Sequence, residues 1–166
     1  MTAPDSISFV SWATLLATGQ ADAQRGFAKL EEEAAKVSFY SDRIISGPLQ
    51  TRGYARAVLN EAIGLHQTTD DLDQGVEART DRRRILEDPG KRIRIILHED
   101  AFYQRVGNPA VMAEQMRHLV SLVIDKPAAL TLGVLPRTAS YHPSLAGGGS
   151  SSTTTAPSAR RLPWVS

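Results

Sequence analysis

The sequence has no cysteine among its 166 residues, which excludes disulfide bonds, thiolate metal sites and a cysteine nucleophile. No stretch approaches the ~18 consecutive apolar residues of a membrane-spanning helix. The segment 1–10 lacks the basic start and the long apolar run of a secretion signal. These absences predict a soluble protein of a reducing compartment, and we expect it in the cytoplasm without contact to a membrane.

An excess of charge of one sign is also missing. Lysine and arginine total 19 against 18 acidic residues, a net charge of +1. DNA-binding chains usually carry a basic face or a recognisable motif. The local arginine run from Arg82 to Arg84 is typical of the solvated end of a helix, at Arg82 and Arg84 above all. We therefore expect no direct binding of nucleic acid by this chain.

Motifs for catalysis and metal binding are absent as well. The sequence lacks the G-x-S-x-G elbow, the phosphate-binding loop and the dinucleotide glycine pattern. The aspartates that follow Thr69 lack the loop glycine and the closing glutamate of a calcium site. The four histidines do not have the spacing of metal ligands. The sequence predicts no metal site, no cofactor and no enzymatic activity, with a hydrolase that uses Glu99 as its base as a minor alternative.

The first half of the chain has the apolar periodicity of helices. In the segment AQRGFAKLEEEAAKV, the spacing of Phe27, Leu30, Ala34 and Val37 predicts one face of an amphipathic helix. Gly47 and Pro48 indicate a turn, and the acidic residues after Thr69 are typical of a helix start. The segments predicted as helical are 9–16, 22–37, 53–65 and 69–86, with the turn at 46–51.

The second half predicts a strand, a helix and another strand. In RIRIILH, the residues Ile93, Ile95 and Leu97 alternate with their neighbours and share one side of a strand. Asn108 and Pro109 are typical of a helix start, and the helix carries an apolar stripe of Met112, Met116, Leu119 and Val123. The segment ALTLGVLP predicts a second strand that ends at its final proline. The crossover length is compatible with a βαβ-like element.

From residue 146 the composition changes to GGGSSSTTTAPSARR, which has too few apolar residues to offset the entropy of ordering. The chain thus divides into an N-terminal extension at 1–11, a folded domain at 12–145 and a disordered, low-complexity tail at 146–166. The predicted fold class is α+β: a helical N-terminal half packed on a small, mostly open sheet with one crossover helix.

Several polar side chains are predicted to point inward. The helix at 69–86 places two arginines on its apolar stripe, which consists of Leu72, Val76, Arg79, Arg83 and Leu86. Glu99 continues the alternation of the preceding strand, so it is expected on the side of the strand that Ile93, Ile95 and Leu97 share. Gln115 adjoins the apolar stripe of the next helix. Buried charge is costly unless it is paired, so an arginine–Glu99 contact is expected. The arrangement fits either a structural ion pair or a polar cleft that binds an anionic ligand or a partner's side chain.

Six segments, taken together and in order, resemble a known family. They are WATLLATGQADAQRGFAKLEEEAAKV, SGPLQTRGYARAVL, VEARTDRRRIL, DPGKRIRIILHEDAF, PAVMAEQMRHLVSL and LTLGVLP. These segments, over residues 12–143, are similar to the C-terminal regulatory domain of antitoxin-like helix-turn-helix transcriptional regulators from actinobacteria, a domain of unknown function.

The resemblance implies a non-catalytic regulatory interaction domain, which acts in transcription regulation while another domain holds DNA. It implies as partner a small protein of the toxin type, as in a toxin–antitoxin system, or an intact regulator paralogue; an oligomer is compatible with it. The alternative is a small-molecule sensor for an anionic ligand. The residues that match the family's pattern, and that we expect to bind ligand or partner, are Gln50, Arg79, Arg82, Glu99 and Gln115.

The chain also departs from the family's pattern. Only 11 residues precede Trp12, which is too short for a helix-turn-helix. Ser46 and Pro48 change the turn, and Arg83 stands where the family prefers glutamine. The low-complexity tail stands where the family continues with sheet strands. We therefore expect a truncated domain, incomplete at its C-terminal end, with a sheet edge that has no partner strand and favours association.

Overall fold

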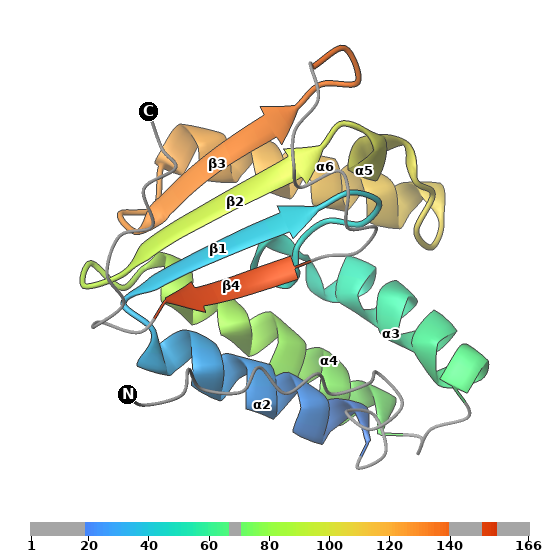
Figure 1. Cartoon of the computed structure of the whole chain (residues 1–166). Helices are drawn as coiled ribbons and strands as arrows, with labels where there is room; N and C mark the ends of the chain where they lie inside the picture. The colour runs from blue at the N-terminus through green and yellow to red at the C-terminus, as the bar shows by residue number, and fades with distance from the viewer. Residues whose placement is uncertain (1–18, 67–70, 140–150, 156–166) are drawn as a thin grey trace, which may run out of the picture.

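The computed structural model describes residues 19–66, 71–139 and 151–155 (Figure 1). The elements are the helices α2 (Gln20–Glu33), α3 (Arg52–His66), α4 (Leu72–Asp81), α5 (Asp100–Tyr103) and α6 (Pro109–Asp125), the short 3₁₀ helices η1 (Gly47–Leu49) and η2 (Arg82–Leu86), and the strands β1 (Lys36–Ser41), β2 (Arg92–His98), β3 (Leu130–Leu135) and β4 (Ser151–Thr155). None of the described helices is both long enough and apolar enough to cross a membrane.

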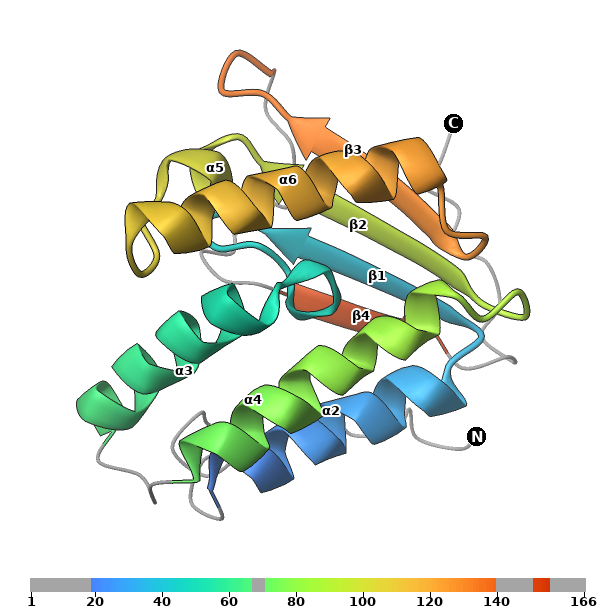
Figure 2. The ribbon, with the colours of Figure 1, turned by 180° about the vertical axis from the view of Figure 1, so that it is seen from behind.

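The strands form a single mixed sheet in the order β3-β2-β1-β4. Strands β1, β2 and β3 are parallel, and β4 runs antiparallel to β1. Helix α6 connects β2 to β3 as a crossover, which confirms the predicted βαβ element. Seen from behind, the helices lie over one side of the sheet (Figure 2). The predicted α+β class, with a crossover helix on a small sheet, is confirmed.

Strand β1 is the main difference from the sequence prediction. The helix predicted over 22–37 ends at Glu33, and Val37 belongs to a strand. The segment Val37–Ser38–Phe39–Tyr40 is rich in β-branched and aromatic side chains, and its backbone pairs in parallel with β2. Leu30, predicted to face the core, is 54% exposed. The apolar stripe read from the sequence therefore joined residues of two different elements.

Helices α2 and α4 pack along each other through a buried face on α2 that is largely polar. That face contains Gln20, Gln24 and Glu31 together with small alanines. The carboxylate of Asp71, just before α4, accepts hydrogen bonds from the backbone N–H groups of Gln20 at 3.1 Å and of Ala21 at 2.8 Å. Asp71 thus satisfies free N–H groups at the start of α2 and fixes how the two helices meet.

The core lies between the sheet and its helices. The side chains of Ile93, Ile95 and Leu97 are buried there, as their alternation predicts. Burial of each such side chain stabilises the fold by ~1.5–3 kcal/mol. Leu119 of α6 joins this core, but Val123 does not, because Leu122 occupies the buried position at that end of the helix.

Helix α6 begins where its local sequence predicts. The side-chain oxygen of Asn108 accepts a hydrogen bond from the backbone N–H of Val111 at 3.0 Å, and Pro109 occupies the first turn. At the other end Lys126 adopts the left-handed conformation, with φ of 49°, and its N–H donates to the carbonyl of Leu122. These two caps set the length of the crossover between β2 and β3.

The predicted tail contributes a strand to the sheet. Residues 151–155, expected to be disordered, form β4 against β1, so the edge of β1 does have a partner strand. Threonine has a high β propensity, and the edge of β1 offers free backbone donors and acceptors. This corrects the expectation that residues 151–155 are disordered. The rest of 146–166, the extension at 1–11 and the helix predicted at 9–16 lie outside the described residues.

Candidate functional site

A buried turn at residues 45–51 lies where α2, α4 and α6 converge. The side-chain amide of Gln50 donates to the carbonyl of Ile45 at 2.6 Å, and the hydroxyl of Tyr54 accepts from the N–H of Ile45 at 3.2 Å. The hydroxyls of Ser41 and Ser46 lie 2.6 Å apart. The turn is therefore held from within by Gln50, by Ser41 at the end of β1 and by Tyr54 of α3.

Gln115 of α6 holds this turn from the side of the crossover helix. Its side-chain oxygen accepts from the N–H of Thr51 and its side-chain nitrogen donates to the carbonyl of Leu49, both at 2.8 Å. Gln115 is completely buried. A single amide thus satisfies one donor and one acceptor of the buried backbone on either side of Gln50.

Two arginines reach the same turn from the opposite side. The Nε of Arg79 donates to the side-chain oxygen of Gln50 at 2.7 Å, and its Nη1 donates to the side-chain oxygen of Gln24 at 3.2 Å. The Nη2 of Arg83 donates to the backbone carbonyl of Gln50 at 3.1 Å. Gln50 is therefore the shared acceptor for both guanidinium groups.

Arg82 is buried, which corrects the prediction that it belongs to a solvated helix end. It is only 8% exposed and forms a two-pronged ion pair with Glu31, in which Nε donates to Oε2 at 3.0 Å and Nη2 contacts Oε1. Its Nη1 donates to Gln24 at 2.8 Å. The prediction fails because α2 packs on α4 and brings Glu31 to Arg82. Arg84, in contrast, is exposed as predicted.

The backbone at Gly47 also depends on Arg82. A Cβ atom built on Gly47 would lie 3.1 Å from Nη1 of Arg82. The absence of a side chain at Gly47 therefore lets the guanidinium lie directly against the turn. We use the term arginine–glutamine cluster for the residues that meet here: Gln24, Glu31, Gln50, Arg79, Arg82, Arg83 and Gln115.

Glu99 lies outside the arginine–glutamine cluster. Strand β2 ends at His98 and the chain turns into α5, so the alternation of side chains between the two faces of the strand does not extend to Glu99. Its carboxylate instead accepts from the backbone N–H of Arg137 at 2.9 Å. The structure thus brings Gln50, Arg79, Arg82 and Gln115 together but not Glu99. The expected ion pair between an arginine of the helix predicted at 69–86 and Glu99 is not formed in the described residues, and Arg82 pairs with Glu31 instead.

Glu31 and Gln24 are the members that the sequence analysis missed. Gln24 lies four residues after Gln20, and Glu31 lies seven residues after Gln24, so the three polar residues share one helix face. This periodicity is visible in the sequence. It was hidden because polar residues at helical spacing are normally assigned to the solvated side of a helix.

The cluster carries more positive than negative charge. Within the described residues, Arg82 has Glu31 as its carboxylate partner, whereas neither Arg79 nor Arg83 has a carboxylate within 4.0 Å. Burial and, secondly, the charge of Arg82 lower the pKa of Arg79 to about 9. At neutral pH this guanidinium therefore remains protonated, and the cluster holds three cations.

The charge of Arg83 acts on His118 of α6. Burial lowers its pKa below 6.5, the charge of Arg83 lowers it further, and Glu114 opposes the shift. As the pH falls through 6.5, the unfolded chain takes up the proton before the folded one, so stability decreases.

We predict that the free energy of unfolding, measured in urea, decreases less between pH 7.5 and pH 5 in His118→Gln than in the parent. If the free energy of unfolding decreased equally in the variant and in the parent, the lowered pKa of His118 would not account for the loss of stability.

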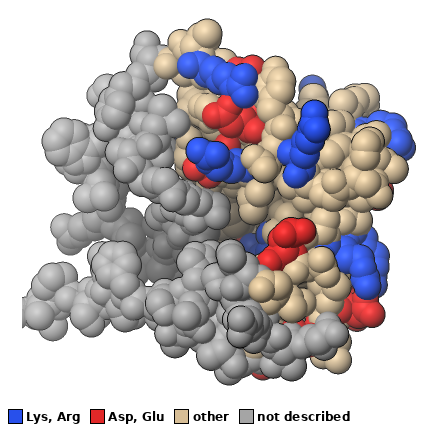
Figure 3. All heavy atoms as spheres, turned by 90° about the vertical axis from the view of Figure 1, so that its right-hand side faces the viewer, with Lys and Arg blue, Asp and Glu red and all other residues tan. Residues whose placement is uncertain are grey.

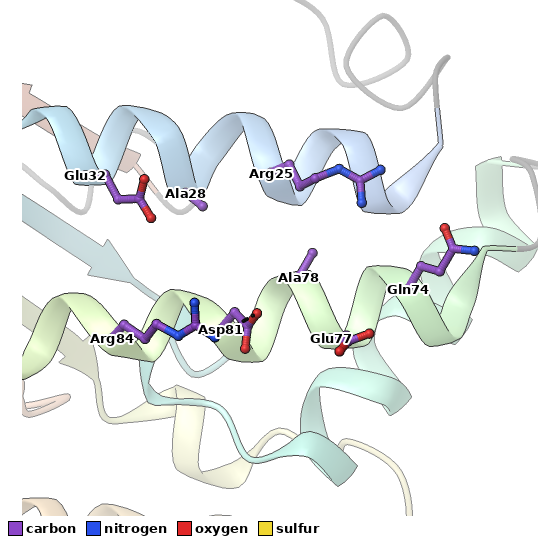
Figure 4. Close-up of a pocket in the computed structure, with 8 residues that line it drawn as sticks. All are labelled: Arg25, Ala28, Glu32, Gln74, Glu77, Ala78, Asp81 and Arg84. Carbon is purple, nitrogen blue, oxygen red and sulfur yellow. Dashed lines mark ion pairs between the residues drawn. The ribbon is translucent and has the colours of Figure 1, made fainter.

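The outer side of α2 and α4 forms a second feature, a groove of about 440 Å³. Figure 4 shows its lining, which comes from both helices: Arg25, Ala28, Glu32, Gln74, Glu77, Ala78, Asp81 and Arg84. The Nη2 of Arg84 lies 3.4 Å from Oδ2 of Asp81, so these two side chains form an ion pair within one helical turn. Because acidic and basic side chains both line it, the groove favours neither anions nor cations clearly.

The face shown in Figure 3 is similarly mixed in charge: Lys and Arg side chains lie beside Asp and Glu side chains, among residues of other types. In the part of the chain that the structure describes, no three Asp, Glu or His residues come together as a cation site. The arginine–glutamine cluster, in contrast, brings three guanidinium groups to one buried turn.

Comparison with known proteins identifies the domain but not its activity. Residues 24–165 match the model of a family described as Domain of unknown function (DUF5753). The match extends beyond residue 145 and includes β4, so the tail belongs to the matched region. No curated protein and no solved structure matches the chain. Because the match covers most of its length, the chain belongs to the DUF5753 family.

Proposed function

We propose that this chain is a non-catalytic regulatory interaction domain of the kind that the antitoxin-like helix-turn-helix regulators of actinobacteria carry. The six ordered segments that resemble those regulators support this role. In this proposal the domain acts in the cytoplasm and binds a protein: a small partner of the toxin type or an intact regulator paralogue. Binding of DNA belongs to another domain.

The observation that carries the proposal is an apolar patch on the outer side of α6. Val120, Val123 and Ile124 are 58%, 57% and 70% exposed. Their spacing of three and four residues places them on one face of the helix. A contiguous group of exposed branched apolar side chains is costly in water and commonly marks a surface that a partner covers. We call these three residues the α6 patch.

The neighbouring strand strengthens this assignment. Strand β3 is an outer strand of the described sheet, and its sequence LTLGVL contains no charged residue and no proline before Pro136. Lysines, prolines and bulges normally protect an outer strand against pairing with other chains. An unprotected outer strand that follows α6 in the sequence fits a surface that a partner covers.

The residues matched to the family then support binding indirectly. Gln50, Arg82 and Gln115 are buried, so their side chains hold the turn and cannot contact a partner directly in this conformation. They stabilise the packing of α2, α4 and α6 around the turn. In this proposal the arginine–glutamine cluster orients α6, and the α6 patch makes the contact.

The test is an affinity pull-down of the tagged chain from lysate of its own cells, with parallel variants. The double variant Val120→Ser, Ile124→Ser should weaken capture of a small partner or regulator by about tenfold or more, because loss of central apolar contacts commonly costs 2 kcal/mol or more. Arg117→Ser, Asp125→Ser, which changes two exposed polar positions of the same helix, should capture as the parent does.

Circular dichroism should show that both double variants remain folded. Failure of the folded parent to retain any protein would overturn the proposal. Equal capture by the parent and by the Val120→Ser, Ile124→Ser variant would remove the α6 patch as the contact surface.

A further inference from the structure

The outer edge of β3 carries backbone groups that the described sheet does not use. The carbonyls of Ala129, just before β3, and of Leu135, at its end, accept hydrogen bonds from β2, so the odd-numbered residues of β3 face that strand. The even-numbered residues face the other way, where no described strand pairs with β3. Leu132 and Val134 therefore turn their N–H and C=O groups outward, one residue on either side of Gly133.

The side chain of Val134 stands at this edge on the helix side of the sheet. Leu130 and Leu132, which alternate in step with it along the strand, pack against the core. Val134 shares their face of the sheet but is 54% exposed. An uncovered apolar side chain thus stands beside the unused backbone groups.

The α6 patch lies on the flank of α6 that points past β3. On the opposite flank α6 contacts α3, since a Cβ atom built on Gly53 would lie 3.3 Å from Oε2 of Glu114 and 3.6 Å from Cγ2 of Val111. Val120 follows Val111 by two and a half turns at ~3.6 residues per turn, so it points away from α3. Figure 2 shows α3 on the β1 side of α6, away from β3. The α6 patch and the edge of β3 therefore belong to one surface.

The edge of β3 is complementary to itself. In an antiparallel pair centred on Gly133, Leu132 of one copy lies opposite Val134 of the other, and each such pair exchanges two backbone hydrogen bonds. A two-fold axis also brings residues near it close to their own copies, so a charged residue there would meet a like charge. Neither the strand LTLGVL nor the α6 patch contains a charged residue.

The same axis brings the two α6 patches together. An axis perpendicular to the sheet keeps both α6 helices on one side of it. At ~3.3 Å per strand residue and ~1.5 Å per helix residue, the step from Leu130 to Gly133 is as long as six or seven residues of helix. Because α6 ends shortly before β3 begins and runs back along it, the axis crosses the second half of α6, where the α6 patch lies.

We propose that a second copy of this chain covers this surface, with the two β3 strands paired antiparallel about Gly133 in one continuous sheet. This assignment rests on the proposed function, because it names the partner of the same α6 patch. A single foreign strand would pair with β3 but would leave the α6 patch exposed, whereas a second copy covers both. A regulator paralogue that carries the same domain can form the same contact.

The first test is cross-linking of the purified full chain through one introduced cysteine. The chain has no cysteine of its own, and a Cβ atom on Gly133 would meet no atom within 4 Å. At the axis the two facing Cα atoms would be about 4.5 Å apart, within the range of a disulfide bond. Under mild oxidation Gly133→Cys should form a covalent dimer at least about tenfold faster than Asn60→Cys, which changes an exposed residue of α3.

Sedimentation equilibrium measures the same association without a cysteine. At about 50 µM the parent should have twice the mass of the 18.0 kDa chain. Val134→Lys places like charges near the axis and should weaken self-association by about tenfold or more. Val120→Ser, Ile124→Ser should weaken it as well, whereas Asn60→Lys adds the same charge on α3 and should associate as the parent does. Circular dichroism checks that each variant is folded.

A folded parent that stays monomeric would overturn the proposed self-association, and so would equal cross-linking of Gly133→Cys and Asn60→Cys. A parent dimer that Val134→Lys and Val120→Ser, Ile124→Ser leave unchanged would place the contact elsewhere and overturn it too. If Gly133→Cys or Val134→Lys does not fold, the remaining variants decide in the same way. Capture of a different protein through the α6 patch would support the proposed function even if the parent were monomeric.

Discussion

Replacement of Arg82 by alanine is expected to lower the free energy of unfolding by about 3–5 kcal/mol. The substitution leaves the carboxylate of Glu31 buried in the α2–α4 interface with no cation beside it, since Arg82 is its only ion-pair partner in the described part of the chain. It also removes the donor to Gln24 and the group that lies against Gly47. Urea denaturation monitored by circular dichroism measures this change.

Two controls distinguish the effect of breaking the buried ion pair from the effect of losing a positive charge anywhere on the protein. Arg84→Ala removes a guanidinium from the exposed pair with Asp81 and should change stability by no more than ~0.5 kcal/mol. The double variant Arg82→Met, Glu31→Leu removes both buried charges and should recover most of the stability, because apolar side chains avoid the cost of burying charge. A loss in Arg82→Ala no larger than that in Arg84→Ala would show that the pair does not hold α2 on α4.

Gln115→Met is expected to destabilise the chain by at least about 2 kcal/mol although the two side chains have similar volumes. Methionine cannot accept from the N–H of Thr51 or donate to the carbonyl of Leu49, and both backbone groups stay buried. Each buried group without a partner costs roughly 1–3 kcal/mol. The same denaturation experiment measures the loss, and hydrogen exchange at the amide of Thr51 should become faster.

The matched control is Gln104→Met, at an exposed glutamine in the loop before α6. It makes the same chemical change without removing a buried hydrogen bond, so the parent's stability should be retained. If Gln115→Met unfolded at the same urea concentration as Gln104→Met, the turn would not depend on α6. The amide of Thr51 should then exchange as slowly as in the parent.

These two results bear on the proposed partner binding because the buried turn contacts several helices. Gln50 accepts from both Arg79 and Arg83, and Gln115 ties the same turn to α6. Loss of either contact should loosen the helix that carries the α6 patch. A variant in the cluster is therefore expected to weaken partner capture through stability, whereas Val120→Ser, Ile124→Ser weakens it with the fold intact.

Local patterns in the sequence determined β2, α6 and β3. The alternation of Ile93, Ile95 and Leu97 is a property of neighbouring residues, and so are the Asn108–Pro109 start and the proline that ends β3. The structure confirms each of these. The caps and periodicities of an element act within one or two turns of chain, so they can be read without knowledge of the fold.

Only the tertiary structure decided which polar residues meet. Arg82 and Glu31 are 51 positions apart, and their pairing depends on the way α2 packs along α4. The same packing hides Gln24, while the turn after β2 takes Glu99 away from the arginines. Strands β1 and β4 likewise depend on partner strands distant in sequence. Charge pairing and strand pairing are interactions across space, and a sequence specifies them only through the whole fold.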